Sequence, residues 1–211
     1  QFLFWQQWQA LKQYAASKDV LLFGDMPIFV AHDSADVWVD RALFMLDEKG
    51  RSTHVAGVPP DYFSETGQRW GNPLYQWSVH EQQDFSWWNQ RLASQLDLFD
   101  MIRIDHFRGF EAFWQIPTQC ETAIEGQWIT GPGEKLFDSL VTEFGELPFV
   151  AEDLGIITEQ VNALRQRYAL PGMKILQFAF GGEADNPYLP HQHERDSVVY
   201  TGTHDNDTTV G

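Results

Sequence analysis

The chain has 211 residues, of which 43% are hydrophobic and 21% are charged, a composition typical of a folded globular protein. Its formal net charge of −16 argues against a nucleic acid or an anionic membrane as partner, because both would repel it. The single cysteine, Cys120, excludes a disulfide within the chain, and no apolar run is long enough to span a membrane.

The first part of the chain predicts a helix, a strand and a long irregular stretch. The chain begins inside a helical pattern over residues 1–16, so we expect it to be a piece of a longer protein. A buried strand is predicted at Val20–Phe23, stopped by Gly24 and Asp25. Residues 26–84 are rich in glycine, proline and aromatic side chains. They are too many for a plain connection, so we expect an inserted lid or small subdomain there.

The rest of the chain alternates between helices and short apolar strands. Helices are predicted at residues 85–98, 134–144 and 159–168, and strands at residues 101–104, 149–151, 173–180 and 198–200. This alternation implies parallel strands joined by right-handed crossovers. A doubly wound sheet would also fit, but it usually carries a Gly-rich phosphate turn. No such turn is present, so we favour part of a parallel barrel.

Acidic residues stand where the predicted strands end. Asp25 follows the first strand, Asp105 the second, Glu152 the third, and Asp205 comes shortly after the last. In a parallel α/β barrel, the carboxyl ends of the strands form the active face. The spacing therefore predicts that these acids share one functional site.

Arg103 and Asp105 form the sharpest of these motifs. They are two residues apart on a strand, so their side chains point to the same side. A guanidinium beside Asp105 would keep this carboxylate ionised, as the nucleophile of a glycosyl-transferring enzyme must be. A purely structural ion pair at the end of a strand is the alternative.

Two further motifs supply acids. Successive side chains of an extended chain alternate, so only one of Glu152 and Asp153 can enter the barrel. A carboxyl entering near Asp105 and Asp205 would hold its proton more tightly, as a general acid must. His204 and Asp205 could both hydrogen-bond sugar hydroxyls. The alternatives are acidic residues favouring a helix N-terminus and a helix cap, respectively.

Several segments resemble, in the same order, the motifs of the amylomaltases, also called disproportionating enzymes, which are 4-α-glucanotransferases of glycoside hydrolase family 77. They are the third-strand signature at 24–30 and 33–38, the active-site lid at 57–73, the nucleophile motif at 103–109, the acid/base motif at 151–155 and the third-carboxylate motif at 202–206. The matches span nearly the whole chain. The resemblance implies that residues 1–211 are part of one catalytic (β/α)8 barrel, about strands 3 to 7, with residues 26–84 as the inserted lid region.

The resemblance also implies a retaining double displacement on α-1,4-glucans. Asp105 would be the nucleophile, Glu152 the general acid and base, and Asp205 the group that holds the ring hydroxyls of the distorted sugar. No metal or organic cofactor is implied, and a His191–His193 pair lacks a third ligand. The other residues expected at the substrate are Arg103, His204, Gln68, Trp70, Asp25 and Tyr62.

Transfer instead of hydrolysis requires that water be kept from the covalent intermediate, and we expect the lid aromatics Tyr62, Phe63 and Trp70 to cover it. Such an enzyme would act on starch, glycogen or maltooligosaccharides in the cytoplasm, or in the plastid stroma of a plant. Five strands cannot close a barrel, so we expect the isolated chain to be inactive. An α-glucan hydrolase and a non-catalytic carbohydrate-binding segment remain as alternatives.

Overall fold

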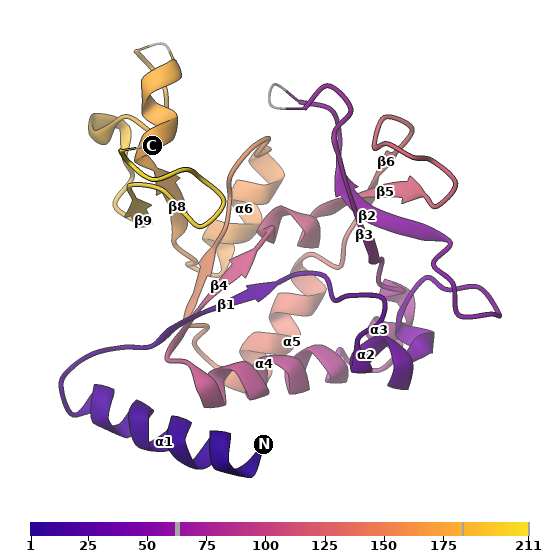
Figure 1. Ribbon diagram of the computed structural model, residues 1–211, viewed down its shortest axis with the longest axis horizontal. Helices are drawn as coiled ribbons and strands as arrows, with labels where there is room; N and C mark the ends of the chain where they lie inside the picture. The colour runs from indigo at the N-terminus through magenta and orange to yellow at the C-terminus, as the bar shows by residue number, and fades with distance from the viewer. Residues whose placement is uncertain (62–63, 183, 211) are drawn as a thin grey trace.

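The structure is a computed structural model that describes residues 1–61, 64–182 and 184–210. Within these residues the chain forms an α/β structure with three sheets (Figure 1). The first sheet is parallel and the third antiparallel, and the second is a single parallel pair. In order they are β1–β4–β7 (Phe23–Pro27, Met101–Asp105, Phe149–Ala151), β8–β9 (Gly172–Ile175, Ser197–Tyr200) and β3–β2–β5–β6 (Gln68–Pro73, His54–Val58, Ala112–Pro117, Gln127–Thr130).

The parallel sheet β1–β4–β7 carries the main core on one face. The helices α4 (Ser86–Leu98) and α5 (Glu134–Phe144) lie along this face (Figure 1). Ile102 and Ile104 of β4 are 0% and 2% exposed, and burial of each stabilises the fold by about 1.5–3 kcal/mol. Because side chains alternate along a strand, these two isoleucines leave Arg103 and Asp105 to face the other side of the sheet.

An aromatic cluster fixes the segment that follows β4. The short helices α3 (Trp77–Gln82) and η2 (Phe107–Phe110) meet α4 in this cluster. Trp88 is fully buried, with Trp77 stacked on it at 5.9 Å and Phe110 edge-on at 5.2 Å between ring centroids. Phe110 therefore ties η2 to the core directly after the end of the central strand.

The remaining helices surround these sheets. In α1 the Trp8 indole donates a 2.8 Å hydrogen bond to the carbonyl of Leu98 at the end of α4. In α6, the Thr158 side chain accepts from the Val161 amide at the N-terminus. The C-terminus of this helix is a Schellman turn in which the Leu170 amide donates to the Arg165 carbonyl. None of the helices in the described ranges could cross a bilayer. The bounds are α1 Phe2–Ala16, α2 Ala35–Val39, η1 Arg41–Leu43, α6 Glu159–Arg167, η3 Leu176–Gly181 and η4 Pro190–Gln192.

The structure confirms the predicted helices and corrects several strands. β1 begins at Phe23 instead of Val20, and Asp25 lies inside this strand instead of after it. β8 ends at Ile175, and the residues after it form the 3-10 helix η3. The parallel pairs are confirmed, but they belong to two sheets. Between β7 and β8 there is no continuous ladder, and isolated hydrogen bonds such as that from the Ala151 amide to the Pro171 carbonyl, at 2.8 Å, connect this part of the chain to β7.

The antiparallel sheet was not predicted. Its strands β2 and β3 lie in the stretch 26–84, whereas β5 and β6 follow the nucleophile motif. The pairing joins His54 to Pro117 and Gly57 to Trp114, and it buries a small second cluster of Val55, Ile116 and Ala123. Its two halves, β3–β2 and β5–β6, are far apart in the chain, so their pairing through β2 and β5 could not be predicted from a local pattern.

Candidate active site

A cavity of about 560 Å³ lies at the carboxyl ends of β4 and β7. The central strands supply one wall, and the antiparallel sheet and the C-terminal segment supply the others. Six of the residues expected from the sequence line it, namely Gln68, Trp70, Arg103, Asp105, Glu152 and Asp205. The structure therefore brings together residues that are up to 137 positions apart.

Arg103 holds two carboxylates at once. Its Nη1 donates to both oxygens of Asp25 at 2.9 Å, and its Nη2 donates to Oδ1 of Asp105 at 2.9 Å. Arg103 is only 8% exposed, and Asp25 is its register partner on the neighbouring strand β1. The predicted Arg103–Asp105 pair is confirmed. Asp25 is bound to this guanidinium and is absent from the cavity lining.

Opposing effects act on the pKa of Asp105. Burial raises it, the Arg103 guanidinium lowers it, and the negative charges of Asp25 and Asp205 raise it again. The net shift is upward from the ordinary value. The Arg103 cation favours the ionised form, as expected, but burial of Asp105 is the larger effect on its pKa.

Glu152 accepts two backbone hydrogen bonds and is nevertheless a weak acid. The amide of His106 donates to Oε2 at 2.7 Å, and the amide of Leu154 donates to Oε1 at 2.9 Å. Burial raises the pKa of Glu152 from 4.5 to about 7; the two amides oppose this, and the charge of Asp105 adds to it. The predicted direction is confirmed, but burial outweighs the acidic neighbours as its cause.

The adjacent Asp153 points away from the cavity, as the alternation along the chain predicted. Its side chain is 5% exposed, with Oδ2 lying 3.3 Å from Nε of Arg165. Its Oδ1 accepts from the Met173 amide at 2.7 Å, which ties the end of β7 to β8. Glu152 is therefore carried on a turn that is anchored from behind.

His106 connects the two acids through the backbone. It follows Asp105 directly and adopts a left-handed conformation with φ of 55°, in the turn where its amide meets Glu152. Its ring packs edge-on to Trp70, with 4.8 Å between the centroids. Burial, helped by the nearby Arg108, lowers the pKa of His106 to about 3, so the ring is neutral.

Several lining residues escaped the sequence argument. Arg108 of η2 lies with its guanidinium carbon 3.9 Å from the ring centre of Trp128 and donates to the carbonyl of Ile156. Trp128 comes from β6, which was not predicted. Arg108 lies within the motif at 103–109, so the motif could have indicated that it belongs to the site. Asp61 and Phe178 also line the cavity.

The other predicted residues lie as follows. His204 is not part of the lining, and its Nε2 is 3.4 Å from Oδ1 of Asp205. On β3, the Trp70 indole donates to Oε1 of Gln68 at 3.0 Å. Tyr62, like its neighbour Phe63, lies outside the described residues. Within the described part of the chain, no group of three or more His, Cys, Asp or Glu side chains could hold a metal ion.

Comparison with known proteins gives one consistent result. The family model described as 4-alpha-glucanotransferase matches residues 1–211. The chain is 61% identical to the 4-alpha-glucanotransferase of Thermus thermophilus, over 100% of this chain and 43% of that protein. It is 54% identical to the chloroplastic/amyloplastic 4-alpha-glucanotransferase of Solanum tuberosum, over 100% of this chain and 37% of that protein.

A solved structure is similar as well. It is the amylomaltase from Streptococcus agalactiae in complex with acarbose, which superposes with a TM-score of 0.94 at 42% identity. The superposition covers 98% of this chain and 42% of the other. The chain thus spans less than half the length of the relatives that it matches.

Proposed function

Because this chain belongs to the 4-alpha-glucanotransferase family, glycoside hydrolase family 77, we propose that it carries the catalytic groups of an enzyme that transfers α-1,4-glucan segments. The acceptor is the 4-hydroxyl of another glucan or of glucose. The observation that carries the proposal is the pair of carboxyls, Asp105 and Glu152, in one cavity but in different environments. Asp105 is bound by a guanidinium, whereas Glu152 is partly buried and has a pKa of about 7.

In the first step Asp105 attacks the anomeric carbon of the donor glucan and forms a covalent glycosyl ester. Glu152 gives its proton to the departing glycosidic oxygen, which leaves as the 4-hydroxyl of the released glucan. A pKa of about 7 leaves a large share of Glu152 protonated at neutral pH, ready to donate. The Arg103 guanidinium holds Asp105 in place and favours its ionised form.

In the second step Glu152 is a carboxylate and takes the proton from the 4-hydroxyl of the acceptor. The acceptor oxygen attacks the anomeric carbon, the bond to Asp105 breaks, and the new α-1,4 bond forms with retention. Net charge and protons balance over the two steps, so no cofactor is required. The amides of His106 and Leu154 stabilise the ionised form that Glu152 takes here.

The remaining residues bind or position the substrate. Asp205 holds ring hydroxyls of the sugar at Asp105, with His204 beside it. Asp25 acts through Arg103, which it binds with both oxygens. The other proposed contacts are Gln68, Trp70 and Tyr62, with Trp70 and Tyr62 also belonging to the lid that keeps water away.

The finer architecture is part of the same proposal. The parallel strands β1, β4, β7, β8 and β9 would be about strands 3 to 7 of a (β/α)8 barrel, a reading supported by the likeness to the amylomaltase structure. Residues 26–84 would be the lid region inserted in this catalytic domain. The partners would be maltooligosaccharides, starch or glycogen chains, in the cytoplasm or, as in the potato relative, in a plastid.

A chimeric enzyme tests the proposal. This chain replaces the matching segment of the Thermus thermophilus relative, which supplies the rest of that protein's length, and the chimera is incubated with maltotriose. We expect a ladder of longer maltooligosaccharides together with glucose. Asp105→Asn should abolish the ladder, while Tyr14→Phe, on the exposed side of α1, should leave it unchanged.

Other outcomes would contradict transfer. Glucose and maltose without longer products would identify a hydrolase. Retention of maltotriose without any product, and equally by the Asp105→Asn variant, would identify a carbohydrate-binding segment. The chain on its own is measured in parallel, because its activity without the additional length is a separate question.

A further inference from the structure

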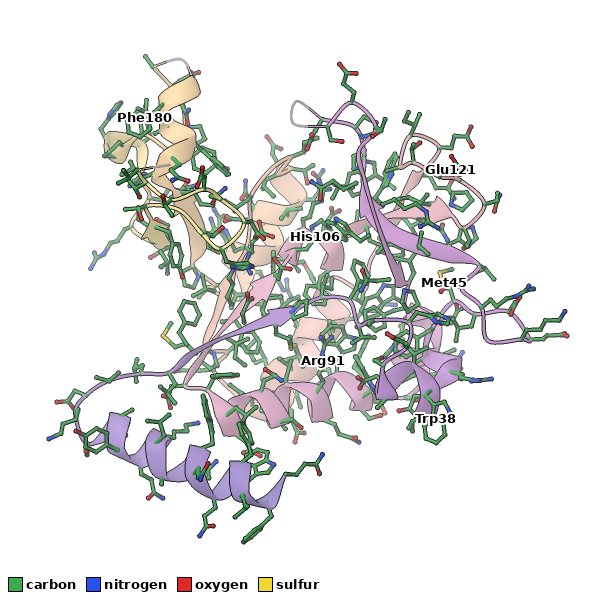
Figure 2. The ribbon with its side chains drawn as sticks, viewed as in Figure 1. Trp38, Met45, Arg91, His106, Glu121 and Phe180 are labelled. Carbon is green, nitrogen blue, oxygen red and sulfur yellow. The ribbon has the colours of Figure 1, made fainter. Side chains whose placement is uncertain are left out.

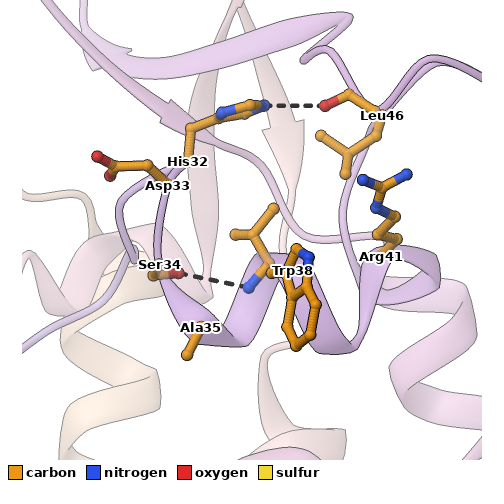
Figure 3. Close-up of a pocket in the computed structure, with 9 residues that line it drawn as sticks. His32, Asp33, Ser34, Ala35, Trp38, Arg41 and Leu46 are labelled. Atoms are coloured by element: carbon orange, nitrogen blue, oxygen red, sulfur yellow. Dashed lines mark hydrogen bonds between the residues drawn. The ribbon is translucent and has the colours of Figure 1, made fainter.

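A second pocket, of about 420 Å³, lies apart from the catalytic cavity. It is formed by the segment 32–34, the helix α2 and the turn that contains η1 (Figure 3). It shares no lining residue with the cavity. In Figure 2, Trp38 lies at the lower right of the molecule, well away from His106 near its centre.

Trp38 provides a flat apolar surface in this pocket. Its side chain is 75% exposed, the largest exposed fraction of any tryptophan in the chain. Figure 3 shows the indole below a space that His32 and Arg41 also face. An indole exposed to this extent has a face available for stacking against a ligand.

His32 supplies a second polar group beside the indole. Its Nε2 lies 2.9 Å from the carbonyl of Gly50, and a carbonyl can only accept. Nε2 therefore donates to this carbonyl, which leaves Nδ1 as the ring nitrogen that can meet a ligand. The backbone thus fixes the orientation of the ring before any ligand arrives.

Arg41 supplies donors. Among the described residues no hydrogen bond or ion pair satisfies its guanidinium. The group lies against Gly50, where an added Cβ would come within 3.3 Å of the guanidinium carbon, and Gly50 itself has φ of +77°. Because Gly50 has no side chain, the Arg41 guanidinium can pack against the backbone there, beside the pocket. Its N–H groups remain able to bind a ligand.

We propose that this pocket binds a segment of α-glucan, separate from the catalytic cavity. A glucose ring has an apolar face that stacks on an indole and a rim of hydroxyls that both donate and accept. Trp38, Arg41 and His32 offer these three complements. An anionic ligand is disfavoured by the net charge of −16. The choice of α-glucan rests on the proposed function, since it is the polymer that the enzyme meets.

Such a site would hold one part of a long glucan while another part reaches the catalytic cavity. Binding of the second part then becomes intramolecular, which raises its effective concentration. The benefit exists only for chains long enough to reach both places. Short maltooligosaccharides would gain nothing from it.

Native gel electrophoresis through glycogen tests the inference on the chain itself. The wild-type chain should be retarded, with about tenfold weaker binding for Trp38→Ala and about threefold weaker binding for Arg41→Gln. Tyr14→Ala is the matched control, since Tyr14 has an exposed ring but lines neither this pocket nor the catalytic cavity. Its retardation should equal that of the wild type.

The outcomes are separable from those of the transfer assay. Trp38-dependent retardation should persist in an Asp105→Asn background, whether or not the chimera transfers. Equal retardation of wild type and Trp38→Ala would overturn the inference and leave the maltotriose result untouched. A Trp38→Ala variant with unchanged retardation but a lower melting temperature would show that Trp38 serves the fold. A smaller sedimenting mass would show that the pocket holds a second copy of the chain, and either result would overturn the inference.

Discussion

The raised pKa of Glu152 predicts a specific loss of stability as pH rises. The carboxyl has a pKa of 4.5 before folding and about 7 in the folded protein, so the folded state binds the proton more tightly. Below pH 4.5 both states are protonated. Between pH 4.5 and 7 the unfolded state loses its proton first, and folding becomes progressively less favourable.

The magnitude follows from the two pKa values. Their difference, 7 minus 4.5, is about 2.5 pH units, and each unit corresponds to about 1.4 kcal/mol. The free energy of unfolding should therefore fall by roughly 3 kcal/mol across this window because of Glu152 alone. Above pH 7 the contribution should stay constant.

Urea denaturation of the wild type and of Glu152→Gln between pH 4 and 8 isolates the effect. The glutamine has nearly the same shape and does not titrate. Its amide also changes the bonds to the His106 and Leu154 amides, but this offset does not depend on pH. The wild type should lose stability relative to the variant by roughly 3 kcal/mol. Two stability profiles that run parallel over the whole range would refute the reasoning.

Three further substitutions test the structure elsewhere. Ala169→Gly should raise the free energy of unfolding in urea by up to about 1 kcal/mol, because Ala169 has a left-handed φ of 51° at the end of α6. Ala163→Gly, inside that helix, should lower it by about the same amount. Trp88→Ala should cost about 3–5 kcal/mol in urea denaturation, against less than about 0.5 kcal/mol for the exposed Tyr14→Ala. Arg103→Gln should lower the melting temperature more at pH 7 than at pH 4, because it leaves the ionised form of Asp105 without the cation that lowers its pKa. An equal loss at both pH values would contradict this.

Local patterns were sufficient for much of the fold and for the acids of the site. The predicted helix at 134–144 and the predicted strand at 149–151 match α5 and β7 at both bounds. Their signals are helical spacing and a short apolar run, which depend only on neighbouring residues. The side-chain alternation that placed Arg103 beside Asp105, and Glu152 apart from Asp153, is equally local.

The rest depends on contacts that no short pattern contains. β5 pairs with β2 more than 50 residues earlier, so its register could not be read from its own sequence. Trp128 enters the cavity only because β6 pairs with β5. The pKa shifts of Asp105 and Glu152 are dominated by burial, which is set by the packing of the whole site.

The central position of β4 has a consequence for the synthesis of the chain. Within the described residues β1 pairs with β4, and β2 is completed by β5, which follows β4. During synthesis on the ribosome, β1 therefore remains unpaired with β4 while the roughly 70 residues up to Met101 are made, which takes about 4 to 15 seconds at usual translation rates. During this time the edge of Phe23–Pro27 that pairs with β4 is open, next to the exposed Val20 and Leu21. The arrival of β4 closes this edge, and the same five residues deliver Asp105 to the site.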